Sequence, residues 1–205
     1  SAASDVYKRQ VFGNPDLAPQ NESTPIAPKS AYGRAKAEAM REVAAARGRG
    51  LRASSAILFN HESPRRPDRF VSMKIARAAA VIASGRDHDL VLGDLDARRD
   101  WGAAIDYVAA LERMALQDRG SDYVIATGVS LAVRDLLDIA FDRVGIDWRE
   151  HVRIDESLVR PPEAVERRGD YAKAQRELGW HPSTPIAAVI REMVDAQLRA
   201  LEPPS

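Results

Sequence analysis

Apolar and polar stretches alternate along this chain in a way that predicts strands and helices following one another in turn. Apolar runs of strand length lie at residues 51–60, 90–92 and 123–126. The first run (LRASSAILFN) lacks clean alternation of apolar and polar residues, which is typical of a strand covered on both faces. A short edge strand is also expected at residues 151–154.

Between these runs, apolar residues recur at helical spacing. In the stretch that begins at Phe70, for example, Ile75, Ala79 and Ile82 form one stripe. Polar caps and glycines mark the helix ends. On these signals we expect helices over residues 30–47, 70–85, 103–117, 133–144 and 170–178, and a last one opening at Thr184. Strands and helices in alternation predict an α/β architecture.

The chain lacks one feature of a dinucleotide-binding α/β protein. A doubly wound sheet that binds a dinucleotide normally begins with a strand, the sequence G-x-G-x-x-G and a helix. No such cluster occurs here, because Gly48 and Gly50 close a helix rather than open one. Two explanations stay open: the protein binds no dinucleotide, or this is the C-terminal part of a longer chain whose first strands precede it.

Composition narrows the class of protein. The 205 residues are 45% hydrophobic and 29% charged, with a formal net charge of zero, so no global field favours nucleic acid or a membrane. The absence of cysteine excludes disulfide and thiolate chemistry, and the four scattered histidines show no metal-binding spacing, so no metal is expected. No apolar run approaches the ~18–20 residues of a transmembrane helix. We therefore expect a cytoplasmic protein.

Tyr32 and Lys36 are the first candidates for chemistry. They lie one turn apart near the start of the helix expected over residues 30–47, and at that spacing they share a face. A lysine one turn from a tyrosine can lower the pKa of the phenol and make it a usable acid or base. Continuing the stripe leads to Met40 and Val43, so we expect this face to be buried. The alternative is a lysine that reaches solvent beside an ordinary half-buried aromatic.

Two polar loops follow expected strands. Residues 61–69 (HESPRRPDR) come after the run 51–60, at the strand end where open α/β sheets bind ligands. The loop 94–102 (DLDARRDWG) carries Arg98 and Arg99, and paired guanidinium groups suit a diphosphate. The alternative is a solvated charge cluster in which Asp94, Asp96 and Asp100 neutralise the arginines. We expect Trp101 and Trp180 to be packing residues.

Seven stretches carry a family resemblance: VFGNP (11–15), SAYGRAK (30–36), LFNHESPRR (58–66), LGDLDARRDWG (92–102), YVIATG (123–128), RPPE (160–163) and DYAKAQRELGW (170–180). With them the chain resembles the extended short-chain dehydrogenase/reductase superfamily and, within it, the GDP-mannose 4,6-dehydratases. The resemblance implies the C-terminal part of a Rossmann-like doubly wound sheet plus a smaller α/β substrate-binding subdomain. We expect residues 11–66 to form the last portion of the cofactor-binding domain. Residues 67–205 are expected to form mainly the subdomain that binds the nucleotide sugar.

The resemblance also implies a reaction and roles for residues. Tyr32 would take the proton of the sugar 4-hydroxyl while the C4 hydride moves to NADP, and Lys36 would hold the nicotinamide ribose. His61 and Arg66 would be further NADP contacts. Substrate-binding roles for GDP-mannose would fall to Asn60, Lys74, Arg99 and Arg160. The full-length protein would be a homodimer or homotetramer.

The chain departs from the family pattern at its beginning. Where the family has a Thr or Ser that binds the 4-hydroxyl and a Glu that removes the C5 proton, this sequence has Lys8 and Gln10. Glutamine cannot serve as a carboxylate base. The preceding SAASDVY is not expected to form a strand, and likeness begins abruptly at Val11. We therefore interpret residues 1–10 as foreign, and expect the 205-residue chain to be inactive by itself.

Two alternatives stay open. One is another epimerase, dehydratase or reductase of nucleotide sugars from the same superfamily. The other is a non-catalytic module that binds a nucleotide sugar or takes part in assembly.

Overall fold

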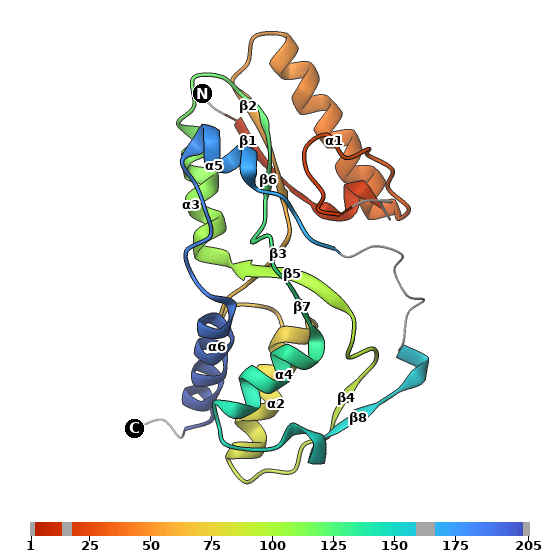
Figure 1. The fold of residues 1–205 in the computed structure, drawn as a ribbon, viewed down its shortest axis with the longest axis vertical. Helices are drawn as coiled ribbons and strands as arrows, with labels where there is room; N and C mark the ends of the chain where they lie inside the picture. The colour runs from red at the N-terminus through yellow and green to blue at the C-terminus, as the bar shows by residue number, and fades with distance from the viewer. Residues whose placement is uncertain (1–2, 14–17, 159–166, 203–205) are drawn as a thin grey trace. The chain divides into compact units, whose positions relative to one another are not determined.

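A computed structural model of the chain describes residues 3–13, 18–158 and 167–202, with the backbone alone for residues 3–10 (Figure 1). Its strands are β1 (Ala3–Lys8), β2 (Ala53–Leu58), β3 (Asn60–Glu62), β4 (Leu90–Leu92), β5 (Arg98–Ala103), β6 (Asp122–Ile125), β7 (Ser130–Ala132) and β8 (Val152–Ile154). Its α-helices are α1 (Ala31–Gly48), α2 (Val71–Ala83), α3 (Ala104–Ala115), α4 (Val133–Asp142), α5 (Ala172–Leu178) and α6 (Ile186–Leu201). Short 3-10 turns lie at η1 (Arg9–Phe12), η2 (Trp148–Glu150) and η3 (Glu156–Leu158).

The described chain divides into two compact units that are interleaved along the sequence. Unit 1 comprises Ser1–His61, Arg99–Ser130 and Glu163–Ser183, and unit 2 comprises Glu62–Arg98, Leu131–Pro162 and Thr184–Ser205. The division expected near residue 66 treats the chain as two consecutive segments. The arrangement differs because β6, α3 and α5, which come late in the sequence, return to pack on β2 in unit 1.

Unit 1 is built on a parallel sheet with the order β1-β2-β6. Leu58 of β2 pairs with Lys8 of β1 on one side and with Ile125 of β6 on the other. Every residue of β2 is buried, which confirms the strand covered on both faces that the sequence predicts. Figure 1 shows α1 on one face of this sheet and α3 and α5 on the other.

The side chains of β2 alternate between two apolar clusters, as the two-residue period of a strand requires. Ala56 and Leu58 face the cluster with α3 and α5, whereas Ile57 and Phe59 face the cluster with α1. The larger cluster contains Ala56, Leu58, Tyr107, Ala110, Met114, Tyr123, Ile125, Ala174, Leu178 and Trp180. Burial of apolar side chains on both faces is the main free-energy term that holds these layers together.

β1 corrects one expectation from the sequence. SAASDVY is not expected to form a strand, yet Ala3–Lys8 pairs in parallel with β2 along its whole length. The physical reason is that the backbone of a buried strand must be hydrogen-bonded on both sides. β6 serves one side of β2 and β1 serves the other.

Three short strands also lie where the sequence predicts loops or nothing. β3, β5 and β7 form a second sheet with the order β3-β5-β7. β5 begins with Arg98 and Arg99, and this polar start gives no strand pattern, although its last four residues are buried. All three strands pair with segments that are distant in sequence, and local periodicity does not reveal such partners.

Unit 2 contains α2, α4 and α6, which pack against one another, and the parallel pair β4 and β8. The alanines of α2 at positions 76, 78, 79 and 80 are fully buried, so α6 approaches closely through Val189, Ile190, Met193 and Val194. β8 confirms the edge strand expected at residues 151–154. In the described part of the chain no helix is long and apolar enough to cross a bilayer.

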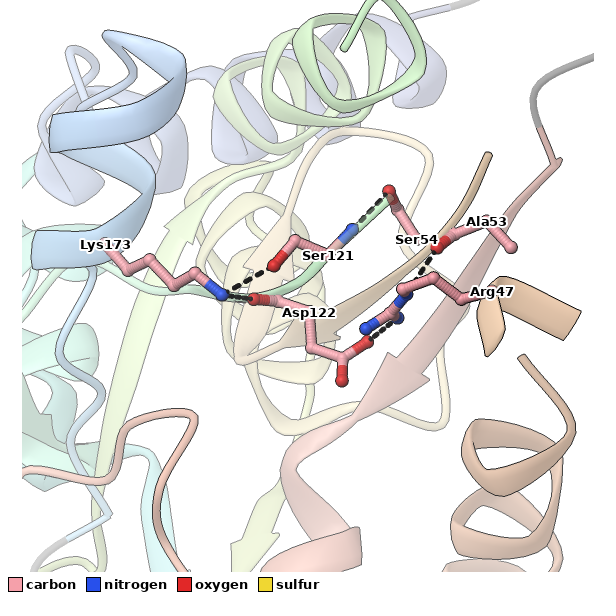
Figure 2. A network of polar contacts seen from close by, with 6 residues as sticks. All are labelled: Arg47, Ala53, Ser54, Ser121, Asp122 and Lys173. Carbon is pink, nitrogen blue, oxygen red and sulfur yellow. Dashed lines mark hydrogen bonds and ion pairs between the residues drawn. The ribbon is translucent and has the colours of Figure 1, made fainter. Parts of the chain in front are cut away.

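A polar clasp ties the end of α1 to the starts of β2 and β6 in unit 1 (Figure 2). The Nε of Arg47 donates to the carbonyl of Ala53 at 2.9 Å, and its other end pairs with Asp122 at 2.5 Å. Lys173 of α5 reaches the same place, where its Nζ donates to the Ser121 hydroxyl at 2.7 Å and to the Asp122 carbonyl at 2.9 Å. The clasp therefore connects α1, α5 and the sheet.

Candidate active site

Tyr32 and Lys36 lie on the first turns of α1. Ser30 caps this helix, and its hydroxyl accepts a hydrogen bond from the backbone N–H of Gly33 at 3.0 Å. The Nζ of Lys36 lies 6.0 Å from the centroid of the Tyr32 ring, which confirms that the two side chains are neighbours. The Tyr32 side chain is 46% exposed, so a ligand can reach it.

The expected burial of this face is confirmed for Met40 and for Val43, which packs against the same core cluster, but it is wrong for the first two turns. The buried residues of α1 are Gly33, Ala37 and Met40, whereas Lys36 is half-buried and Tyr32 is exposed. Gly33 and Ala37, each one position after Tyr32 and Lys36, are the residues of the first turns that are buried. Lys36 therefore does not carry the cost of a fully buried charge.

The backbone at positions 8 and 10 lies at the carboxyl end of β1. β1 ends at Lys8, opposite Leu58 at the end of β2, and η1 then contains Gln10. The carbonyl of Val11 accepts a hydrogen bond from the N–H of Ala27, at 3.1 Å, in the loop that leads to α1. Ligands of open α/β sheets bind beyond this strand end.

His61 lies on β3, directly after the buried segment of β2. Its Nδ1 is 2.9 Å from the carbonyl oxygen of Phe59. Because a carbonyl can only accept, Nδ1 must carry the proton, and this bond fixes the ring orientation. The ring also lies 5.3 Å from that of Tyr107 at an angle of 44°. Asn60, its half-buried neighbour, is on the same strand.

Arg66 is held by its own loop in unit 2. Its Nε lies 3.1 Å from the Glu62 carboxylate, and the guanidinium carbon lies 3.7 Å from the centroid of the Phe70 ring. Burial lowers the pKa of Arg66, and Glu62 opposes this shift. Ser72 donates to the same carboxylate at 2.5 Å. Lys74 is one turn from the start of α2 and is exposed.

Asp100 does not belong to a solvated charge cluster. The alternative that Asp94, Asp96 and Asp100 neutralise the arginines in solvent is therefore wrong for this residue. Its side chain is 1% exposed, and its carboxylate accepts bonds from neutral donors on Thr127, Gly128 and Gly169. Asp96 instead pairs with Arg134 of α4 at 2.5 Å. Burial raises the pKa of the Asp100 carboxyl, and the donated hydrogen bonds oppose that shift.

Sequence reasoning missed Asp100 and Glu22 as organising groups. Glu22 lies in the polar loop before α1, and its carboxylate accepts a bond from the N–H of Val124 at 2.7 Å. No sequence signal marks it, because its partner is distant along the chain. For Asp100 the sequence does carry a sign of burial, because this carboxylate directly precedes the apolar residues of β5. Arg160 lies outside the described residues.

The packing roles expected for the tryptophans are confirmed. Trp101 is 4% exposed and Trp180 is 2% exposed. The indole N–H of Trp180 donates to the carbonyl of Asp106 at 2.8 Å, which satisfies the buried donor. Over the described residues there is no group of three or more histidine or acidic side chains able to hold a metal ion.

Solved structures define the fold class to which this arrangement belongs. The structure of RMD from Pseudomonas aeruginosa complexed with NADPH matches 97% of this chain and 67% of its own length, with a TM-score of 0.89 and 23% identity. A dTDP-glucose 4,6-dehydratase from Bacillus anthracis in complex with NAD matches 97% of the chain and 62% of its own length, with a TM-score of 0.82 and 18% identity. The chain thus has the Rossmann-like fold of these two structures.

Sequence comparison then identifies the family. The family model of GDP-mannose 4,6 dehydratase matches residues 9–193, so the chain belongs to this family. GDP-mannose 4,6 dehydratase 1 of Arabidopsis thaliana is 43% identical over 92% of this chain and 52% of its own length. The enzyme of Homo sapiens is 39% identical over 94% of the chain and 56% of its own length. The chain therefore spans about half the length of the curated relatives it matches.

Proposed function

We propose that this chain is part of a GDP-mannose 4,6-dehydratase, a lyase that converts GDP-mannose to GDP-4-keto-6-deoxymannose. The reaction oxidises C4 of the sugar, removes water across C5 and C6, and reduces C6, so it involves no net redox change. The observation that carries the proposal is the adjacency of Tyr32 and Lys36 on the first turns of α1, in a chain of this family.

Tyr32 and Lys36 are the proposed catalytic pair. The exposed phenol of Tyr32 exchanges a proton with the sugar 4-hydroxyl, and the Lys36 ammonium group lies 6.0 Å from the centroid of its ring. Lys36, His61 and Arg66 contact the cofactor, for which we propose NADP. This nicotinamide cofactor accepts and returns a hydride when bound. The NADPH and NAD complexes of the two structural relatives support a nicotinamide cofactor.

Asn60, Lys74, Arg99 and Arg160 are the proposed contacts of the nucleotide sugar. Lys74 is exposed and Arg99 is half-buried, so a diphosphate can reach both. We also propose that the complete protein is a cytoplasmic homodimer or homotetramer.

A second candidate function follows from Lys8 and Gln10. If these residues are native, the chain lacks a carboxylate base there and acts as a non-catalytic module that binds a nucleotide sugar. If residues 1–10 are foreign, the natural sequence restores the threonine or serine and the glutamate. Sequencing the DNA upstream of the codon for Val11 separates the two cases.

Joining residues 11–205 to the amino-terminal part of a family member tests the proposed lyase directly. We expect the joined protein to consume GDP-mannose, and Tyr32→Phe to lower kcat by at least about 100-fold, because it removes the acid/base group. Arg41→Ala is the control, since this exposed residue of α1 pairs only with the exposed Glu38 among the described contacts. Equal turnover of UDP- or dTDP-glucose would contradict the substrate, and an active Tyr32→Phe variant would contradict the role of the tyrosine.

A further inference from the structure

The Asp100 carboxylate is the centre of a buried hydrogen-bond hub in unit 1. Oδ1 accepts from the N–H of Thr127 at 2.8 Å and from its hydroxyl at 2.7 Å. Oδ2 accepts from the N–H of Gly128 at 2.9 Å and from the N–H of Gly169 at 3.2 Å. The backbone N–H of Asp100 also donates to the carbonyl of Arg167 at 3.0 Å. Three chain segments therefore meet at one carboxylate.

This hub uses all the acceptor capacity of an ionised carboxylate, which has about four lone-pair sites. A buried carboxylate is costly unless each site is occupied. Here the four donors come from the loop after β6 and from the segment before α5, neither of which belongs to β5. The side chain is therefore built to join two loops to β5, because a residue needed only for packing would be apolar.

The glycines at the hub show that the loops are shaped for this contact. Gly128 has φ +76°, a backbone conformation that residues with a Cβ rarely adopt. A Cβ at Gly169 would lie 2.8 Å from the Phe59 ring, closer than packed carbon atoms approach. Both glycines thus let a backbone N–H come within bonding distance of the carboxylate.

Arg99 is the residue whose position this arrangement controls. Neighbouring residues of a strand point to opposite sides, so fixing the Asp100 side chain on one side of β5 directs the preceding side chain to the other side. Arg99 is half-buried, whereas Asp100 and the three residues after it are buried, so Arg99 is the residue at which β5 passes from the surface into the core. Any rotation or slip of β5 that moved Arg99 would have to break the bonds of the hub.

We propose that Asp100 is a positioning residue, whose carboxylate locks β5 and two loops into one frame that holds Arg99 ready for the diphosphate of the nucleotide sugar. The diphosphate part of this inference rests on the proposed function, whereas the locking of Arg99 stands on the hub itself. Asp100 contacts no reacting atom. Its role is exerted through the loops and through Arg99.

Asp100→Asn tests this role in the 205-residue chain. The amide keeps the size of the side chain but turns one acceptor into a donor that faces backbone N–H groups. Asp96→Asn is the matched control, because Asp96 is an exposed carboxylate that pairs with Arg134. Three properties are measured: GDP affinity by calorimetry, hydrogen exchange of the amides of residues 127, 128 and 169, and the NMR signal of the Arg99 Nε–H. Each protein is measured well below its own melting temperature.

We expect Asp100→Asn to expose these three amides to exchange, to shift the Arg99 signal and to weaken GDP binding by about tenfold or more. Asp96→Asn changes none of these. Arg99→Ala weakens GDP binding as well, and the double variant with Asp100→Asn binds GDP no more weakly than Arg99→Ala alone. This non-additivity is the signature of one residue acting through another.

A purely structural role gives a different result. Asp100→Asn would then lower the melting temperature, but the folded variant would keep the Arg99 signal and the GDP affinity, which overturns the inference. If the unaltered chain does not bind GDP, the diphosphate part of the inference fails, and the substrate of the lyase is decided by the joined protein. The locking role is then decided by the Arg99 signal: a shift caused by Asp100→Asn supports it, and an unchanged signal overturns it.

Discussion

Glu22 illustrates how one side chain closes the edge of a sheet. β6 is the outer strand of the order β1-β2-β6, and the carboxylate of Glu22 accepts from the N–H of Val124 on its open side. Burial raises the pKa of Glu22, while the bond from Val124 and the charge of Lys173 oppose the shift. The neutral form of Glu22 is therefore favoured in the folded state more than in the unfolded one.

Replacing Glu22 by glutamine should change the pH dependence of stability. Since the folded pKa lies above the unfolded value of 4.5, the folded state binds more protons in the window above pH 4.5, and stability falls as pH rises through the folded pKa. Glu22→Gln keeps an acceptor for Val124 and cannot ionise. We expect its unfolding free energy, relative to the unaltered chain, to rise from pH 4.5 to pH 7 in urea titrations.

Two further variants complete this test. Glu22→Ala leaves the Val124 N–H without its acceptor and should cost about 1–3 kcal/mol at every pH. Glu38→Gln, at an exposed position of α1, should follow the unaltered chain. Parallel pH curves for Glu22→Gln and the unaltered chain would show that Glu22 titrates alike in both states.

At the residue scale, sequence reasoning found groups whose spacing is local and missed groups whose partners are distant. Tyr32 and Lys36 are four positions apart, so a helix alone brings them together. Asp100 acquires its partners at positions 127 and 169 only when the chain has folded. Even for the local pair, helical spacing did not determine burial: Gly33 and Ala37 are buried in the first turns, whereas Tyr32 is exposed.

At the scale of elements, the clasp of Arg47 is the link between α1 and the sheet that can be tested most simply. Arg47 donates a hydrogen bond to the carbonyl of Ala53 and pairs with Asp122 (Figure 2). Ala53 is the first residue of β2, and Asp122 is the first residue of β6. Arg47→Ala should lower the unfolding free energy by about 1–2 kcal/mol, since it leaves a part-buried carboxylate unpaired. It should also increase exchange of the last amides of α1.

Arg41→Ala provides the comparison for this experiment. Arg41 pairs with Glu38 one turn away, with both side chains more than 60% exposed. An exposed pair of this kind contributes about 0–1 kcal/mol. A loss of stability no greater for Arg47→Ala than for Arg41→Ala would mean that the apolar face of α1 holds the helix without the clasp.

The long elements were predictable because each carries its own pattern. The strand after α1 and the helices from α1 to α6 follow apolar runs, helical stripes and caps that are visible in the sequence. β3, β5 and β7 were not predictable, because β3 and β7 have only three residues each, β5 begins with two arginines, and all three take their partners from distant segments. β1 was missed for the same reason. Its sequence has no local alternation of apolar and polar residues, and it is a strand because it pairs with β2.

At the scale of the whole molecule, the surface carries an apolar stripe on α3. Ile105 is 70% exposed and Val108 is 57% exposed one turn away, and Leu116, after the last turn, is 74% exposed. Contiguous exposed apolar side chains favour association, in contrast to isolated ones. We expect the chain to associate with itself as its concentration rises, and the double variant Ile105→Lys, Val108→Lys to associate less, by sedimentation velocity.

Leu51→Lys is the control for this stripe, because Leu51 is 55% exposed in a loop away from α3 in sequence. Neither variant should lower the melting temperature by more than about 2–4 °C, since exposed positions contribute little to stability. Equal association of both variants with the unaltered chain would place the contact surface elsewhere.

The interleaving of the two units bears on how the molecule is synthesised. The chain passes from one unit to the other after residues 61, 98, 130, 162 and 183. Domains of multidomain chains commonly fold one after another as they leave the ribosome. Here unit 1 still lacks Gly169, whose N–H binds Asp100, until residue 169 is made, and unit 2 lacks α6 until Ile186–Leu201 has been made. Neither core is therefore complete before residue 169 is made, and a ribosome stalled earlier would hold two half-formed cores rather than one finished domain.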